Sequence, residues 1–399
     1  MAHDDSILPL AGIRVLEFTQ NIMGPSAGLV LADLGAEVVK IEQREGGDVS
    51  RAVGPYFLGA DDSHFFQSLN RNKKSLTLDL KHPRGQEVLH RLAATADGLM
   101  GNLRGDQPEK LGIVYDSLKK ANQRIVCAHL SAYGRDGARK GWPGYDYLMQ
   151  GEAGYLSLTG EPDGPPARMG LSVVDYSTGT TCALALLAGI LEARRTGRGR
   201  DLDVSLYDVA MHQLNYPAAW YLNEGLATGR APRSAHPFIA PSQLYRTADG
   251  WIFVMAQTQR FWELLCDALG RGNLKSRPQF RDFAARREHR DELTRVLDDE
   301  FSRQKTEYWL KQLSGTVPCG PVYDLPQALE NPYFLGRGGV QVFDHPDKPG
   351  FKLVASPFRL AEALPARPAP KLGQHTEELL KDLGYSPGEI AELKNEGVV

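Results

Sequence analysis

The first 130 positions alternate between short apolar runs and longer stretches with helical spacing. Ile13–Glu17 and Glu37–Glu42 are short runs of Val, Ile and Leu, which is typical of buried strands. Between them, Gly24-Pro25 opens a helical pattern that continues to Leu34. A strand, a turn, a helix and a second strand within about 30 residues form a βαβ unit, which predicts a parallel sheet.

The same alternation continues along the chain. Helices are expected at Pro83–Ala96 and Tyr115–Asn122, and strands at Leu76–Leu80, Gly98–Gly101 and Arg124–Leu130. Parallel sheets bind their ligands at the carboxyl ends of the strands, so the loops that follow the strands should carry the binding residues.

The second half of the chain changes in character. The Ala- and Leu-rich segment Thr178–Arg194 predicts a buried helix, and Leu202–Leu206 alternates like a strand. A β-hairpin turning at Asp249-Gly250 indicates a different architecture. We expect a large Rossmann-like α/β domain with a parallel sheet, formed by residues 1–224 and 325–399 and ending in C-terminal helices. A smaller α+β domain at residues 225–324 is inserted in it.

Composition and charge narrow the class of protein. Apolar residues make up 42% and charged residues 24%, which are ordinary globular values. The net charge of -3 offers no broad basic face for nucleic acid and no polybasic arm for a membrane. Apolar runs such as Cys182–Leu191 are too short to cross a bilayer, and Met1–Pro9 does not resemble a signal peptide.

The cysteines point to a reducing compartment. Cys127, Cys182, Cys266 and Cys319 are far apart, without the spacing of a zinc site or a disulfide framework. We therefore expect free thiols, no metal and a cytoplasmic location. The chain also lacks G-x-G-x-x-G, the P-loop and G-x-S-x-G, so nucleotide-dependent redox chemistry, nucleotide hydrolysis and serine catalysis lose support.

Asp175 lies in the segment L-S-V-V-D-Y-S-T-G, where a short apolar strand is expected to end at the aspartate and lead into the buried helix. A helix N-terminus would lower the pKa of this carboxyl group and keep it ionised. An ionised, desolvated carboxylate can act as a nucleophile. The alternative is a helix cap, and the local pattern alone favours the cap.

Two further features carry alternatives. Tyr145, in P-G-Y-D-Y, could lie near a ligand, although a core or interface aromatic is the more common role of a tyrosine. Arg71, Lys73 and Lys74, with Lys81 further on, could contact phosphates, although a solvated surface is the default for such a cluster.

Motifs that are weak singly form an ordered series along nearly the whole chain. They are L-A-G-I-R-V-L-E-F-T, G-P-S-A-G-L-V-L-A-D-L-G-A-E-V-V-K-I-E, N-R-N-K-K-S-L-T-L-D-L-K, P-G-Y-D-Y-L-M-Q, L-T-G-E-P-D-G-P-P-A-R-M-G, V-V-D-Y-S-T-G, T-G-R-G-R-D-L-D-V-S-L-Y-D, P-C-G-P-V, L-G-Q-H-T-E-E-L-L and the terminal G-V-V. In this order they resemble the family III CoA-transferases, which include formyl-CoA transferase, CaiB-type carnitine enzymes and 2-methylacyl-CoA racemases.

The resemblance implies roles for particular residues. Asp175 becomes the nucleophile, and Tyr145 is expected near the acyl group. The family's substrate and coenzyme A (CoA) contacts fall on Gln20, Asn21, Ile22, Met23, Leu78, Lys81, Asn102 and Lys110.

The sequence departs from the family at two places. An adenine-side arginine of the formyl-CoA enzyme falls on Gln43, and Arg44 next to it is the expected substitute. The four-glycine lid of that enzyme is missing from the sequence, so oxalate with the same lid mechanism is not expected. Arg233 and His236, in the equivalent neighbourhood, are candidates to bind a distal substrate carboxylate.

The function implied by the resemblance is transfer of CoA from a succinyl-CoA-like donor to a small carboxylic or dicarboxylic acid. The route passes through aspartyl anhydride and aspartyl-CoA thioester intermediates, in an interlocked homodimer. One alternative is a 2-methylacyl-CoA racemase, but racemases carry histidine in G-H-D where this chain has Tyr145. The other is a non-catalytic CoA-binding protein, in which Asp175 would only cap the helix.

Overall fold

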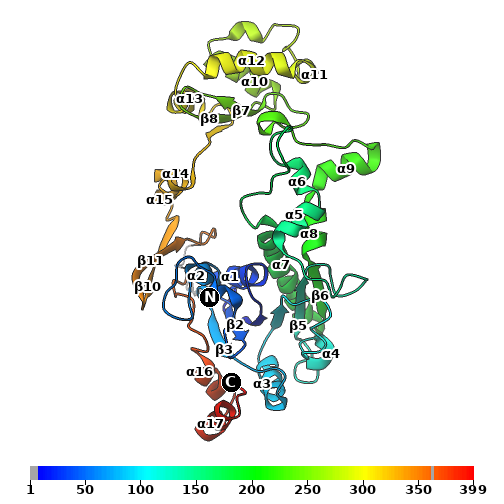
Figure 1. Cartoon of the computed structure of the whole chain (residues 1–399), viewed down its shortest axis with the longest axis vertical. Helices are drawn as coiled ribbons and strands as arrows, with labels where there is room; N and C mark the ends of the chain where they lie inside the picture. Colours follow the sequence, from blue (N-terminus) through cyan, green and yellow to red (C-terminus); the bar gives the residue numbers. More distant parts are fainter. Residues whose placement is uncertain (1–7, 361–363) are drawn as a thin grey trace, which may run out of the picture. The chain divides into compact units, whose positions relative to one another are not determined.

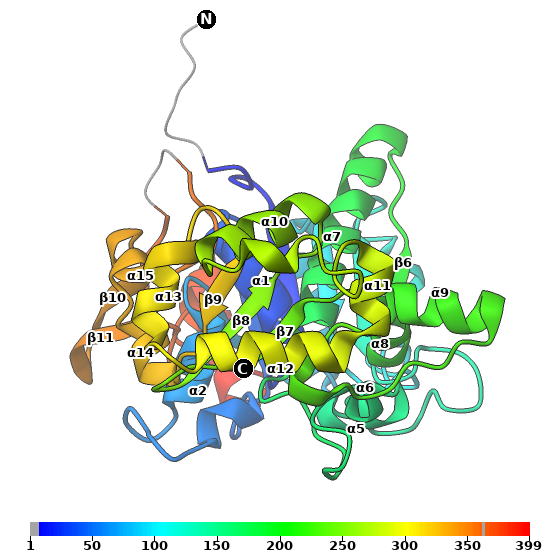
Figure 2. The ribbon, with the colours of Figure 1, turned by 90° about the horizontal axis from the view of Figure 1, so that it is seen from above.

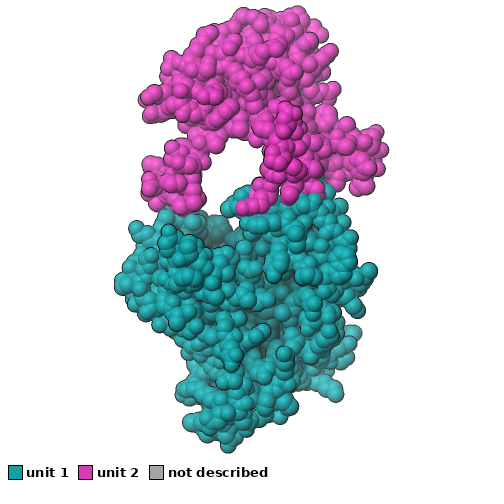
Figure 3. Space-filling model, in the orientation of Figure 1, with its two compact units in different colours: residues 1–153, 170–214, 336–399 teal, residues 154–169, 215–335 magenta. Residues whose placement is uncertain are grey.

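The computed structural model describes residues 8–360 and 364–399, so most of the N-terminal segment Met1–Pro9 lies outside the described residues. The chain divides into two compact units (Figure 3). The first is formed by the chain up to Ala153, by Gly170–Leu214 and by Gly336–Val399, and the second by Gly154–Met169 and Asn215–Leu335. The second unit extends beyond the predicted limits 225 and 324 and takes in an earlier segment as well.

A parallel sheet forms the centre of the first unit (Figure 1). Its strands are β1 (Arg14–Phe18), β2 (Glu37–Glu42), β3 (Lys74–Thr77), β4 (Gly98–Gly101), β5 (Val126–Ser131) and β6 (Asp201–Ser205). They lie in the order β3-β2-β1-β4-β5-β6, with every pair parallel. The parallel α/β prediction is confirmed. From β1 the chain adds β2 and β3 on one side of the sheet, and it then adds β4, β5 and β6 on the other side. The switch point therefore lies between β1 and β4, and such folds bind ligands there.

Helices cover this sheet, and a hairpin extends the unit. They are α1 (Met23–Asp33), α2 (His64–Asn70), α3 (Pro83–Ala94), α4 (Tyr115–Leu118), α5 (Asp146–Glu152), α7 (Val173–Thr196), α8 (Leu206–Gln213), α16 (Thr376–Asp382) and α17 (Pro387–Asn395), with the turn η1 (Val49–Ala52) and the hairpin β10 (Val340–His345) and β11 (Lys348–Val354). One apolar core joins Leu16 and Val39 of the sheet to Val88 of α3 and Leu379 of α16. The C-terminal helices therefore belong to the first unit.

Helix α7 begins earlier than the sequence indicates. It starts at Val173 with Ser172 as its N-cap residue, so Asp175 lies in the first helical turn. The prediction of a strand that ends at Asp175 was wrong, and so was the alternative that Asp175 is the N-cap. The adjacent valines suggested a strand, but Asp146, which is 29 residues earlier in the chain, accepts a hydrogen bond from the N–H of Asp175 and stabilises the helix N-terminus.

Helix α7 is also long and apolar enough to span a membrane by length and composition, which the shorter run Cys182–Leu191 did not indicate. Its side chains Cys182, Leu186 and Ile190 are buried. A Cβ atom on Gly98 of β4 would lie 2.8 Å from Leu186 Cδ1, so the helix packs closely on the sheet. Such packing is typical of a core helix.

The second unit is a small α+β arrangement (Figure 2). Its antiparallel strands are β7 (Ser242–Arg246), β8 (Trp251–Met255) and β9 (Cys319–Pro321), and the predicted hairpin at Asp249-Gly250 is confirmed. The helices are α6 (Tyr155–Leu158), α9 (Asn215–Glu224), α10 (Gln259–Ala268), α11 (Phe283–Glu288), α12 (Arg290–Phe301), α13 (Thr306–Leu313), α14 (Leu325–Leu329) and α15 (Pro332–Gly336), with the turns η2 (Pro232–Ser234) and η3 (Gly272–Leu274). Tyr245 and Ile252 of the strands share a core with Trp262 and Leu297 of α10 and α12.

Candidate active site

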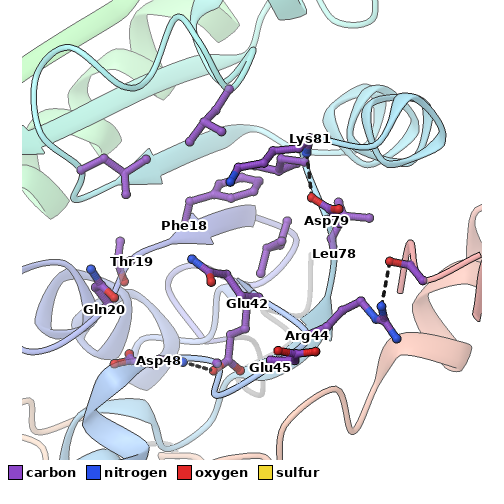
Figure 4. A pocket seen from close by; sticks show the side chains of 17 residues that line it. Phe18, Thr19, Gln20, Glu42, Arg44, Glu45, Asp48, Leu78, Asp79 and Lys81 are labelled. Carbon is purple, nitrogen blue, oxygen red and sulfur yellow. Dashed lines mark hydrogen bonds between the residues drawn. The ribbon is translucent and has the colours of Figure 1, made fainter.

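A cavity of about 410 Å³ lies in the first unit at the carboxyl ends of β1, β2 and β3 (Figure 4). Its lining includes Phe18, Thr19 and Gln20 at the end of β1, Glu42, Gln43 and Arg44 at the end of β2, Leu78, Asp79, Leu80 and Lys81 after β3, and Leu103, Leu111 and Gly397. Through Gln20 after β1 and Leu103 after β4, the lining reaches the switch point of the sheet, where a Rossmann-like fold binds nucleotide-containing ligands. The structure therefore brings Gln20, Arg44, Leu78 and Lys81 to one cavity, and their contact with CoA stays a prediction.

Arg44 is held at the cavity wall by the end of the chain. Its Nη1 donates a hydrogen bond of 3.0 Å to the carbonyl oxygen of Gly397. Gly397 has a φ of 73°, and a Cβ atom at this position would lie 2.5 Å from Arg44 Nη1. Sequence reasoning missed Gly397 as part of the site, although the terminal G-V-V was noted as a family motif.

Asn102 and Lys110 are not among the residues that line the cavity. Asn102 Nδ2 donates to the carbonyl oxygen of Gln20 at 2.7 Å, and its Oδ1 accepts from the N–H of Gln20 at 2.8 Å. Lys110 pairs with Asp106 at 2.8 Å, and it is Leu111 beside it that lines the cavity. The Asn102 side chain thus fixes the backbone of the loop after β1.

Two members of the basic cluster, Arg71 and Lys73, do not lie on a solvated surface. Arg71 forms a buried ion pair with Asp33 at 2.6 Å, and Lys73 lies 2.9 Å from Glu17, with both side chains of each pair buried. Burial lowers the pKa of Lys73 to about 8. Partners far away in the sequence thus occupy these charges, whereas Lys81 is exposed and lines the cavity.

Asp175 is held by a second aspartate. The backbone N–H of Asp175 donates a hydrogen bond of 2.9 Å to Oδ2 of Asp146, and Oδ1 of Asp146 accepts from Gln150 at 2.6 Å. Asp146 therefore supplies the acceptor that the first turn of α7 needs, which is the role considered for Asp175. The Asp175 side chain is 9% exposed, and within the described residues no group donates a hydrogen bond to its carboxylate.

This environment sets the protonation of Asp175. Burial, and then the negative charge of Asp146, raise the pKa of Asp175 from its usual 3.8 to about 7. The predicted lowering by the helix N-terminus was wrong, because desolvation outweighs the helix dipole. Protonated and ionised Asp175 therefore coexist near neutral pH, and the ionised carboxylate has no donor to disperse its charge.

Tyr145 reaches the same region through its neighbour Asp146. It is 64% exposed, so a buried core role is wrong for this aromatic. A Cβ atom on Gly144 would lie 2.5 Å from the Cβ of Ala132, a close approach that only glycine allows. The Gly-Tyr-Asp segment thus places the exposed Tyr145 directly before Asp146, whose carboxylate binds the start of α7.

The loop from Gln20 to Met23 runs from the cavity into α1, which packs against the helix that carries Asp175. The N–H of Asn21 donates to Asp48 at 3.0 Å, whereas the N–H groups of Ile22 and Met23 have no partner within the described part of the chain. A Cβ atom on Gly179 would lie 2.5 Å from the carbonyl oxygen of Met23. Gly179 is one turn beyond Asp175 on the same face of α7, so the start of α1 packs beside the helix that carries Asp175.

Arg233 and His236 lie in the second unit. Arg233 forms an ion pair with Asp298, and Nδ1 of His236 accepts backbone hydrogen bonds from Phe238 and Ile239, each of 3.1 Å. Burial, and then the charge of Arg290, lower the pKa of His236. Both side chains therefore have partners within their own unit, and their contact with a substrate carboxylate stays a prediction.

The thiols and acidic groups are dispersed. All four cysteines are free, with Cys127, Cys182 and Cys266 buried. Across residues 8–360 and 364–399, no group of three or more His, Cys, Asp and Glu side chains is arranged to hold a metal ion.

Comparisons with known proteins agree on one family. The model of CoA-transferase family III matches residues 10–376. Succinyl-CoA:glutarate CoA-transferase of Mus musculus is 33% identical over 402 residues, which cover 99% of this chain and 91% of that protein. Succinyl-CoA:mesaconate CoA-transferase of Haloarcula hispanica is 32% identical over 392 residues, with coverage of 95% and 97%. The crystal structure of a CaiB/BaiF family protein from Brucella suis has a TM-score of 0.82 at 31% identity, and covers 95% of this chain and 100% of that one.

Proposed function

The chain belongs to CoA-transferase family III, and from this premise we propose that it moves CoA from a succinyl-CoA-like donor to a small dicarboxylic acid, with Asp175 as the nucleophile. The observation that supports Asp175 is its buried carboxylate, which receives no hydrogen bond from the described residues and lies in the first turn of α7. The relatives of Mus musculus and Haloarcula hispanica are named for glutarate and mesaconate. Both acceptors are small dicarboxylates, and we propose the same class here.

The first half of the reaction loads CoA onto the enzyme. A carboxylate oxygen of Asp175 attacks the thioester carbonyl of the donor, and the C–S bond breaks to give a mixed anhydride and a CoA thiolate. The thiolate then attacks Cγ of Asp175 and expels the donor acid as a carboxylate. The product is an aspartyl-CoA thioester at Asp175, formed without a net change in protons.

The second half reverses these steps with another acid. The carboxylate of the acceptor attacks Cγ of the aspartyl thioester and releases the CoA thiolate, which leaves an anhydride between Asp175 and the acceptor. The thiolate attacks the acyl carbonyl of the acceptor and frees the Asp175 carboxylate. The backbone N–H groups of Ile22 and Met23 are the candidates to stabilise the oxyanions, because those of Gln20 and Asn21 already have acceptors.

The cavity supports a site for the nucleotide half of CoA. Arg44 and Lys81 line it and offer positive charge to phosphate groups. Phe18 and Leu78 offer apolar contact area for the adenine or pantetheine portion. We therefore place CoA with its phosphates near Arg44 and Lys81, in the first unit.

We also propose that the enzyme is a homodimer. Leu184 and Leu191 of α7 are 70% and 68% exposed. They are seven residues apart and lie on one face of the helix. Large apolar side chains in such an arrangement are typical of an interface, in line with the dimer that the family resemblance implies.

Replacement of Asp175 tests the proposed chemistry. The variant Asp175→Ala should lose transfer from succinyl-CoA to glutarate or mesaconate by several orders of magnitude while it still folds and binds CoA. Asp116→Ala, at an exposed carboxylate in α4, is the matched control and should retain full activity. Substantial transfer by folded Asp175→Ala would exclude Asp175 as the nucleophile.

A further inference from the structure

A buried charge cluster lies beside the CoA cavity, and no step of the proposed mechanism uses it. Its members are the cations Lys40, Arg51 and Lys73 and the carboxylates Glu17, Glu42 and Asp48, whose side chains are at most 2% exposed. A buried ion pair contributes little net stability, because desolvation of the charges offsets their attraction. The position of the cluster therefore points to another role.

Two members of the cluster hold the loop that follows β1. Nζ of Lys40 lies 2.8 Å from Oδ2 of Asp48 and donates a hydrogen bond of 2.7 Å to the carbonyl oxygen of Thr19. Oδ1 of Asp48 accepts from the N–H of Asn21 at 3.0 Å. Lys40 and Asp48 thus bind the backbone on both sides of Gln20.

Asn102, which follows β4, binds the backbone of Gln20, the residue between Thr19 and Asn21. It exchanges two hydrogen bonds with the backbone of Gln20, so three consecutive residues each have a backbone group held by a side chain. Asn21 has a φ of 68°, a conformation that L-residues adopt infrequently. External hydrogen bonds are what keep such a turn in place.

The protonation of the pair agrees with this role. Although burial acts in the opposite direction, the charge of Lys40 and the hydrogen bond from Asn21 lower the pKa of Asp48. Burial likewise opposes the charge of Lys40, but the carboxylates of Glu17 and Asp48 raise its pKa. Both groups therefore stay ionised near neutral pH.

We propose that Lys40 and Asp48 are positioning residues for CoA transfer, which hold the Thr19–Asn21 loop at the wall of the CoA cavity through the carbonyl oxygen of Thr19 and the N–H of Asn21. Thr19 and Gln20 line that cavity, and the loop runs directly into α1, whose start packs against α7. This inference rests on the proposed function, because it assigns the pair to the same reaction at Asp175.

A pair of double variants separates this role from charge burial alone. Lys40→Met/Asp48→Asn and Lys40→Met/Asp48→Leu both remove the two charges, so neither leaves a buried ion unpaired. The amide oxygen in the first variant can still accept from the N–H of Asn21, whereas the leucine cannot. We expect the Asn variant to lower kcat by about threefold, because it loses only the contact of Lys40 with Thr19. The Leu variant should lose a further tenfold to hundredfold, roughly the cost of a misplaced reacting group.

Three further measurements complete the experiment. Melting temperatures from circular dichroism report folding, and Arg71→Met/Asp33→Asn, in a buried ion pair that does not line the cavity, is the control that should keep its kcat. Asn102→Leu releases Gln20 without touching the charges and should also lower kcat, which provides a test even if the Leu double variant does not fold. Intact mass after mixing with succinyl-CoA reports the CoA adduct.

The outcomes are distinct. Equal kcat values in the two folded double variants, or an Asn102→Leu variant as active as the wild type, would overturn the positioning role while an adduct on the wild-type enzyme leaves the proposed function intact. A wild-type enzyme that transfers CoA without an adduct at Asp175 would instead overturn the proposed function and this inference with it.

Discussion

The backbone N–H of Asp175 donates a hydrogen bond of 2.9 Å to the carboxylate of Asp146, a residue 29 positions earlier in the chain. The same carboxylate places a negative charge beside the buried side chain of Asp175 and helps to raise its pKa. One residue therefore stabilises the start of α7 and adjusts the ionisation of the proposed nucleophile.

The pH dependence of transfer should reflect this pair. Only the ionised form of Asp175 attacks the thioester, so kcat/KM of the wild type should rise with pH through a midpoint near the pKa of about 7. Asp146→Asn removes the neighbouring charge but leaves the burial, so the midpoint should fall by about one pH unit. Glu192→Gln, near the other end of α7, should leave the profile in place. An unshifted midpoint in Asp146→Asn would show that the Asp146 charge does not govern the ionisation.

The contribution of Asp175 to the free energy of unfolding should fall as the pH rises. The pKa of Asp175 is raised in the folded protein, so the folded state holds this proton more tightly than the unfolded state does. Its contribution to stability is complete below about pH 4 and is lost as pH rises through about 7. Asp175→Asn, which cannot ionise, should be more stable than the wild type at pH 8 by on the order of 2–4 kcal/mol.

Urea unfolding at both ends of the pH range checks this sign. The stabilisation by Asp175→Asn should shrink as pH falls and approach zero only below about pH 4, where Asp175 is protonated in the unfolded chain as well as in the folded protein. Asp116→Asn, at an exposed carboxylate, should show no such pH-dependent difference. An Asp175→Asn variant that is less stable than the wild type at pH 8 would contradict the raised pKa.

The elements that sequence could predict are those with local causes. β2 (E-V-V-K-I-E) and β4 (G-L-M-G) have the predicted bounds, because short apolar runs between turn residues form buried parallel strands. The start of α7 was missed because its stabilising acceptor, Asp146, lies on another helix. Lys40 and Lys73 were likewise unpredictable as buried groups, since their carboxylate partner Glu17 is 23 and 56 residues away.

The residues of the candidate site also divide into those that a local pattern predicts and those that depend on distant parts of the chain. Gln20, Arg44, Leu78 and Lys81 follow strand ends, so a parallel topology brings them to one cavity once the strand order is known. The contact between Arg44 and Gly397 spans 353 residues and depends on the return of the C-terminal segment. No local pattern contains that information.

Coenzyme A affinity should depend on Arg44 and on its support. Arg44→Ala removes a charge at the cavity wall, and the Kd for CoA should rise about tenfold to hundredfold. Gly397→Ala should displace the guanidinium and weaken binding by a smaller factor. Calorimetric titration with CoA measures both, and Lys119→Ala, at an exposed lysine paired with Asp116, is the control. Unchanged affinity in Arg44→Ala would remove Arg44 from the CoA site.

The proposed dimer has a simple physical test. Light scattering of the wild type should give twice the chain mass of 44.0 kDa. Leu184→Glu/Leu191→Glu places charges on the exposed face of α7 and should shift the protein toward monomer, because unpaired charges are excluded from an apolar interface. Lys120→Glu, at an exposed position elsewhere, should leave the mass unchanged. A wild type that is monomeric at micromolar concentration would contradict the proposal.

The most direct measurement is chemical capture of the aspartyl-CoA thioester. The wild-type enzyme is incubated with succinyl-CoA and quenched with hydroxylamine, which attacks Cγ of a thioester or anhydride and leaves a hydroxamate on the side chain. Peptide mass spectrometry should locate this hydroxamate on Asp175, dependent on succinyl-CoA, with none on Asp146 and none in Asp175→Asn. Active enzyme that yields no modified Asp175, or a modification on a different carboxylate, would contradict the assignment of Asp175 as the nucleophile.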